Sequence, residues 1–165
     1  MRPDRLALAL LLAAGAAQAQ LADVDPDWKE TEAPAPPALR TSGLVPLEMT
    51  GTSLRYGIDP DSVSLGADGI VRYVVVAVGA GGAVNGIYEG LRCNTGEYRV
   101  YARHAGGAWS ASTASGWRKL HDQPQSRHTL QVARTGACIG HGPNRSAAQI
   151  VRDLRAPPEY RFERR

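Results

Sequence analysis

The side chains best suited to chemistry lie in two adjacent segments near the middle of the chain. Tyr88, Glu89 and Arg92 lie in the first segment, and Arg99 and Tyr101 lie in the second. The carboxylate of Glu89, the guanidinium groups of Arg92 and Arg99 and the phenol hydroxyl of Tyr101 can together form a small polar binding site. They can also form an internal salt bridge, because a buried carboxylate needs a partner wherever it lies. The sequence leaves both interpretations open and favours the salt bridge.

Two tryptophans extend this candidate set. Trp28 stands alone in an acidic stretch, and Trp117 follows the two segments. A tryptophan in such a stretch either docks on the folded domain or contacts a partner, and we favour docking. The candidate binding residues are Trp28, Tyr88, Glu89, Arg92, Arg99, Tyr101 and Trp117; no catalytic residue is identified.

The usual signatures of catalysis and metal binding are not found. His104, His121, His128 and His141 are scattered through predicted loops and turns, without partners at metal-ligand or triad spacing, so we expect them at the surface. The glycine-rich turn 79–82 follows a predicted strand but opens no helix, unlike a phosphate loop. We therefore expect no metal and no cofactor.

Cys93 and Cys138 are the only two cysteines. In an oxidising compartment an isolated pair indicates one disulfide. Such a bridge would contribute about 4 kcal/mol in the chain-entropy model. The alternative is a metal site that uses Cys138 and His141, but two ligands without a second pair are a weak signal.

The first 19 residues have the three parts of a secretory signal. Arg2 and Arg5 precede an apolar run over residues 6–14, and the small residues Ala17 and Ala19 predict cleavage after Ala19. The alternative, an N-terminal membrane anchor, is disfavoured because the run is about half the length that spans a bilayer. The expected location is the periplasm or the cell exterior, with no transmembrane segment after cleavage.

The charge of the expected mature chain is small. Without Arg2, Arg5 and Asp4, 17 of the 19 basic and 15 of the 16 acidic residues remain, which gives a net charge of +2. This balance predicts no nucleic-acid partner. We expect a signal peptide over 1–19, an acidic and then proline-rich leader over 20–50, one folded domain over 51–156 and a basic tail over 157–165.

The folded domain is predicted to be α+β, with an antiparallel β-meander of four or more strands followed by one or two helices. The β-branched run over 70–78 predicts a strand buried on both faces. Short strands are expected over 53–58 and 62–65, and another over 116–120.

Residues 84–93 and 98–103 predict a hairpin. Side-chain parity favours an even loop that places Leu91 opposite Val100 and Glu89 opposite Ala102, since a slip of one residue would turn an apolar face to water. Further on, a short helix is expected over 126–134. A second helix should follow an Asn144 N-cap, with one apolar face, Ala147, Ile150, Val151 and Leu154.

The whole pattern resembles the CNP1-like family of exported proteins of Gram-negative bacteria. The resemblance rests on Asp27-Trp28-Lys29-Glu30, on residues 88–93 (Tyr-Glu-Gly-Leu-Arg-Cys), on residues 97–102, on Trp117 and on the second cysteine before a terminal helix. It implies export and a fold, and it brings no established activity. The segment before Cys138 departs from the pattern because it has no aromatic residue. A looser likeness is to surface-adhesin protein E, as shared architecture only.

Three classes of function follow from these observations. The first is a binding or interaction module of the bacterial envelope, with an envelope protein or a small ligand as partner. The second is a structural or accessory envelope protein, and the third is an enzyme of an unrecognised kind. The sequence favours them in that order, and the binding module would use either a face of the sheet or the leader that carries Trp28.

Overall fold

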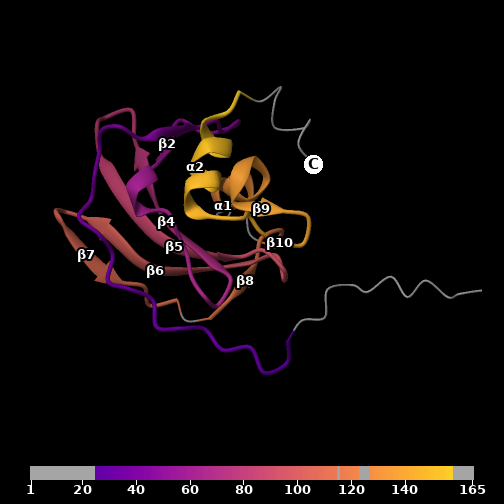
Figure 1. Ribbon diagram of the computed structural model, residues 1–165. Helices are drawn as coiled ribbons and strands as arrows, with labels where there is room; N and C mark the ends of the chain where they lie inside the picture. Colours follow the sequence, from indigo (N-terminus) through magenta and orange to yellow (C-terminus); the bar gives the residue numbers. More distant parts are fainter. Residues whose placement is uncertain (1–24, 115, 123–126, 158–165) are drawn as a thin grey trace, which may run out of the picture.

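The computed structural model describes residues 25–114, 116–122 and 127–157. Within these ranges one large antiparallel sheet is covered by helices on one face and by an extended N-terminal segment on the other (Figure 1). This is the predicted α+β architecture with late helices and one disulfide. The expected signal peptide lies outside the described residues.

The elements follow the chain in a meander. The strands are β1 (Val45–Leu47), β2 (Arg55–Ile58), β3 (Ser64–Leu65), β4 (Ile70–Val78), β5 (Val84–Arg92), β6 (Glu97–Ala105), β7 (Ala108–Ala111), β8 (Arg118–Lys119), β9 (Cys138–Ile139) and β10 (Gly142–Pro143). The helical segments are the short turn η1 (Pro60–Ser62), helix α1 (Arg127–Val132), the wide turn η3 (Ala133–Ala137) and helix α2 (Ala147–Arg155). The sheet order is β1-β2-β4-β5-β6-β7, with β3 beside β4 and β8 beside β6, while β9 and β10 form a separate pair.

The sheet begins at Val45, before the boundary at residue 51 that composition suggests. Val45 and Leu47 are buried and pair with β2, while Pro46 between them is exposed. A proline without an N–H fits in this strand because β1 lies at the sheet edge. This segment therefore forms a strand although its composition is rich in proline.

Strand β4 has the bounds that its β-branched run predicts, and it is covered on both faces. Val71, Tyr73 and Val75 pack with residues of the helices. Val74 and Val76 belong to a second apolar cluster on the other face, together with Tyr88. Strand β4 thus separates two packed layers, and side chains next to one another in sequence enter different environments.

The hairpin register differs from the predicted one by two residues. Leu91 pairs with Tyr98 and Glu89 with Val100, so the four-residue connection is Cys93–Gly96. The prediction kept Cys93 in the ladder, whereas Cys93 leaves it to bond Cys138. Because the shift is even, Glu89 and Leu91 keep the face that parity gave them.

A β-bulge then breaks the regular alternation of β6. Glu89 pairs with Val100 and Tyr88 pairs with Ala102, which leaves Tyr101 as the extra residue. Ala102 packs in the second apolar cluster, on the face away from the helices, and Tyr101 packs against the same cluster. The bulge therefore presents two successive side chains to one face.

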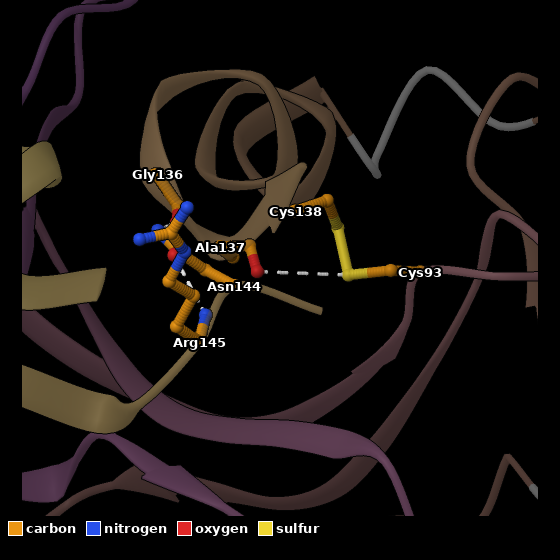
Figure 2. Close-up of a disulfide and its surroundings, with 6 residues drawn as sticks. All are labelled: Cys93, Gly136, Ala137, Cys138, Asn144 and Arg145. Carbon is orange, nitrogen blue, oxygen red and sulfur yellow. Dashed lines mark hydrogen bonds between the residues drawn. A yellow bond between two sulfur atoms is a disulfide. The ribbon is translucent and has the colours of Figure 1, made fainter. Parts of the chain in front are cut away.

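The late helices pack against the sheet as the apolar period predicts, with Ile150 and Leu154 buried. The N-cap of α2 is Ser146, however, whose hydroxyl accepts a hydrogen bond from the Gln149 N–H, 3.1 Å away. The expected cap, Asn144, instead donates to the carbonyl of Gly136, 2.8 Å away (Figure 2). It also donates to the carboxylate of Asp153. Asn144 is buried, and its amide braces the wide turn η3 instead of capping α2.

The disulfide joins Cys93 and Cys138, as predicted, across a Cα–Cα distance of 5.6 Å. The carbonyl oxygen of Ala137 lies 3.7 Å from Cys93 Sγ (Figure 2). The bridge therefore ties the end of the β5–β6 hairpin to the turn between the helices.

Candidate binding site beneath the N-terminal strap

Residues 28–44, the strap, run along the sheet face that the helices leave open (Figure 1). Its far end is held by apolar contacts, because Leu39 and Leu44 pack against the second cluster. In its middle, Trp109 Nε1 donates to the carbonyl of Pro37, 2.8 Å away. This part of the acidic and proline-rich leader therefore covers a sheet face, and its near end makes the polar contacts.

The carboxylate of Glu30 is the centre of these polar contacts. Arg99 Nη1 donates to it over 2.8 Å, Tyr101 Oη over 2.7 Å and Trp117 Nε1 over 3.2 Å. Arg72 Nη2 approaches the same carboxylate at 3.8 Å. We call Arg72, Arg99, Tyr101 and Trp117 the cradle. Hydrogen bonds to an ionised group are the stronger kind, so the cradle is built to hold a carboxylate.

Trp28 docks beside the cradle, as we expected. Its Nε1 donates to the carbonyl of Asp68 over 2.9 Å. The guanidinium carbon of Arg92 lies 3.6 Å from the Trp28 ring centroid, and the ring meets that of Trp117 edge-on at 6.0 Å. A cation over an indole face is a favourable contact, more so where water is partly excluded.

The turn between β3 and β4 supplies a second anchor. Asp68 has no exposed side-chain surface; it accepts two hydrogen bonds from Arg72 and two from Thr31. Burial raises the pKa of Asp68, but the hydrogen bonds from Arg72, Thr31 and the backbone N–H of Ile70 outweigh it and hold the pKa well below its usual range. Asp68 is therefore ionised and binds the strap to β4.

The donors of the cradle keep their protons at neutral pH. Burial raises the pKa of Tyr101, and its hydrogen bond to Glu30 raises it further. Burial lowers the pKa of Arg72, but the hydrogen bond with Asp68 outweighs this effect and leaves it raised. Both side chains thus present donors to an anion.

A glycine on β5 makes room for the cradle. A Cβ at Gly90 would lie 2.8 Å from Tyr101 Cε2 and 2.9 Å from Ile70 Cγ2. The Tyr101 ring therefore lies over a position without a side chain. This explains why glycine stands between Glu89 and Leu91 in the middle of a buried strand.

Beside the Glu30–Arg99 pair, the surface is hollowed by a shallow pocket of about 380 Å³. It is lined by Glu30, Thr31, Glu32, Ala33, Arg99 and Tyr101. The Arg99 side chain is 36% exposed, so the cradle is open to solvent at this point.

A family model for the CNP1-like family matches residues 23–155. The chain belongs to the CNP1-like family. No curated protein and no solved structure gives a significant match. The match begins before Trp28, so the strap lies inside the region that defines this family.

This CNP1-like protein brings six of the seven predicted binding residues to one face. Trp28, Arg92, Arg99, Tyr101 and Trp117 make the contacts described above. Tyr88 lies beneath them, 5.3 Å from Tyr101 between ring centroids. The described part of this CNP1-like chain contains no helix long and apolar enough to cross a membrane.

Glu89 is the exception, because it points to the helix-covered face. It is fully buried, and Thr129 Oγ1 donates to it over 3.1 Å. His128 Nε2 lies 3.1 Å from its carboxylate. His128 is therefore buried and not a surface residue as expected, since a buried carboxylate requires a partner from the element that covers it. The four-residue polar site that would unite Glu89 with Arg92, Arg99 and Tyr101 does not form.

Sequence reasoning missed three members of the site: Glu30, Asp68 and Arg72. One signal was available, because Arg72 is the only charged residue in an otherwise apolar strand and had to find carboxylates. Glu30 carried no such signal, since its hydrogen-bond partners lie 69 to 87 residues further along the chain.

Proposed function

We propose that this CNP1-like protein is an exported binding module of the bacterial envelope, with the cradle and Arg92 as its ligand-binding surface. The observation that carries the proposal is the capture of one carboxylate by three donors, Arg99 and Tyr101 on β6 and Trp117 just before β8. The partner that fits this surface is an acidic segment of another envelope protein.

The chemistry of the surface supports binding over catalysis. Its members are guanidinium, phenol and indole groups, which hold anions and aromatic rings. Tyr101 keeps its proton, because burial and Glu30 raise its pKa, so it serves as a donor and not as a base. Arginine, tyrosine and tryptophan are also the residues that dominate the energy of protein interfaces.

We place the protein in the periplasm, with cleavage after Ala19. The signal pattern of residues 1–19 supports export, and the Cys93–Cys138 disulfide is the chemistry of an oxidising compartment. Fractionation of cells followed by intact mass measurement tests both points. A mature chain that begins at Gln20 in the periplasmic fraction is expected; an uncleaved chain in the membrane fraction would contradict export by a cleaved signal.

Photocrosslinking in intact cells tests the binding surface. A photoreactive amino acid replaces Ala33, which lines the hollow beside Glu30, or Ala148 on helix α2 as a matched control. We expect a protein adduct at position 33 that is absent at position 148 and is lost when Arg99→Ala is added. Equal adducts at both positions, or no adduct at position 33, would contradict a binding role for this face.

One observation favours a second candidate, a structural or accessory envelope protein without a ligand. The strap already satisfies the cradle, as an internal brace would. The same crosslinking experiment separates the two, because a brace gives no adduct at position 33.

A further inference from the structure

The cradle is occupied by a segment of the protein's own strap, and the side chains of this segment show which ligand chemistry the cradle selects. Trp28 packs under Arg92, and two residues later Glu30 enters the cradle. In an extended chain, residues i and i+2 point to the same side. The strap therefore presents an aromatic ring and a carboxylate on one face, and the sheet provides a matching site for each.

We propose that the strap is an internal competitor for the site, and that the true ligand is an extended acidic peptide segment of a partner protein. This segment carries an aromatic ring two residues before a carboxylate, as Trp28 and Glu30 do. The inference rests on the proposed function, because it specifies the ligand of that surface and how access to it is regulated.

Because of the charges in the cradle, replacement of Glu30 by a carboxylate of the ligand is more favourable than release of the strap with no ligand bound. Departure of Glu30 leaves Arg99 without its carboxylate and leaves Arg72 with Asp68 alone. With the strap in place the Arg72 side chain is 3% exposed, so its charge depends on neighbouring carboxylates for compensation. A second carboxylate restores the lost contacts. An acidic ligand is therefore favoured over a neutral or basic one.

The way the strap is attached permits exchange. In each hydrogen bond described above between the strap and the sheet, at least one of the two partners is a side chain. Examples are the bonds of Thr31 with Asp68 and of Trp109 with Pro37. They differ in this from the backbone ladder of a sheet strand, so the strap can leave without opening the sheet. Between these anchors, prolines at positions 34, 36 and 37 keep the strap extended.

The hollow beside Glu30 provides the entry point. An incoming carboxylate can contact Arg99 from this side while Glu30 is still bound, because both residues line the hollow. The strap and the ligand then compete for the same donors. Since the strap is tethered, it competes at an effective concentration on the order of millimolar.

The test uses the mature chain and a synthetic peptide with the sequence of residues 25–33. The peptide is labelled, and its binding to the native chain and to a Glu30→Gln variant is followed by fluorescence anisotropy. We expect the variant to bind the peptide at least tenfold more tightly, because a weakened competitor leaves the site open for a larger fraction of the time. A peptide with glutamine in place of its Glu30 should bind at least tenfold more weakly.

Control variants locate the binding. In the Glu30→Gln background, Arg99→Ala should abolish binding, and Arg155→Ala on the exposed surface of α2 should leave it unchanged. A second strap variant, Thr31→Val, removes the 2.7 Å hydrogen bond to Asp68 and keeps Glu30. It should bind the peptide better than the native chain does, which covers the case in which Glu30→Gln fails to fold.

Several outcomes overturn the inference. Equal affinity of the native chain and both strap variants would show that the strap does not compete. Equal affinity for the glutamine peptide would show that the carboxylate is not recognised. If no variant binds the peptide, the ligand class is wrong; a crosslink at position 33 would then leave the proposed function standing, and its absence would remove both.

Discussion

Arg72 is the residue on which the strap-covered face depends most. It stands in a strand of apolar residues, and its guanidinium group contacts Asp68 at 2.6 Å and approaches Glu30 at 3.8 Å. It also donates to the carbonyl of Thr31. A single buried cation therefore joins the β3–β4 turn to the strap. Breaking such an arrangement by removing one partner is costly, because a charge remains buried without compensation.

The charge of Asp68 gives this face a defined response to acid. In the native state its pKa lies well below the value of about 3.9 expected for the unfolded chain. A depressed native pKa means that the contribution to stability is present above about pH 4 and is lost as the pH falls. In Asp68→Asn, the free energy of unfolding should be lower at neutral pH and should change less between about pH 4 and pH 2.

Urea denaturation at a series of pH values measures this difference. Asp122→Asn, at an exposed position, serves as the control and should follow the native chain. Parallel curves for the native chain and Asp68→Asn would mean that Asp68 is not held as an ionised anchor.

Glu89 is the buried acidic residue on the other face of the sheet, the one that the helices cover. It is fully buried beneath helix α1 and accepts a hydrogen bond from Thr129 of that helix. Glu89→Gln keeps the shape but puts an NH2 group in place of one of the two oxygens that lie against Thr129 and His128, so we expect a loss of about 1–3 kcal/mol in the free energy of unfolding. Chemical denaturation checks this, with the exposed Glu48→Gln expected to change stability by less than about 0.5 kcal/mol. An equally small effect for Glu89→Gln would contradict a pairing role.

Among the elements, strand β5 links the two faces. Its odd-numbered residues Glu89 and Leu91 face the helices, and its even-numbered Tyr88, Gly90 and Arg92 face the strap. Gly90 is the position where the strand must carry no side chain, because Tyr101 lies over it. The bulge in β6 turns Tyr101 toward the strap-covered face, and Gly90 in β5 leaves space for the Tyr101 ring.

Gly90→Ala should therefore disturb the cradle without touching any of its charges. The new Cβ would lie 2.8 Å from Tyr101 Cε2, which pushes the ring away from Glu30. We expect a loss of about 1–3 kcal/mol in stability from overpacking, together with a weakened strap. Thermal denaturation and the fluorescence of Trp28 and Trp117 report the two effects. Gly81→Ala, where a Cβ meets nothing within 4 Å, should be nearly neutral; the same result at Gly90 would show that Tyr101 has room to move.

Local patterns predicted the elements well and their long-range partners poorly. Strand β4 and the apolar face of α2 were predictable because burial on two faces and the helical period leave clear traces in sequence. The predicted hairpin register was wrong by two residues, because Cys93 leaves the β-ladder to form its disulfide. Asn144 was misread as a cap because its brace to Gly136 forms only in the folded chain. The hydrogen bonds of Glu30 to the cradle span 69 to 87 residues, which no local pattern records.

On the scale of the whole molecule, the sheet is a middle layer between two covers of different strength. The helices are tied to the hairpin by the Cys93–Cys138 bridge. The strap is covalently continuous with β1 and otherwise rests on side-chain contacts, apolar at Leu39 and Leu44 and polar at Glu30. The helices are therefore fixed to the sheet, whereas the strap is suited to replacement by a ligand.

A chain that begins at Pro37 tests the contribution of the near end of the strap to stability. It lacks Trp28, Glu30 and Thr31 but keeps the contact between Pro37 and Trp109. Because hydrogen bonds to charged groups contribute about 1.5–3 kcal/mol each, we expect the melting temperature to fall by at least about 5 °C. The matched control is Lys29→Ala, at an exposed strap position between two anchors, which should leave the melting temperature unchanged. An unaltered melting temperature in the truncated chain would mean that Trp28 and Glu30 add no net stability, as expected of a segment retained for contact with a partner.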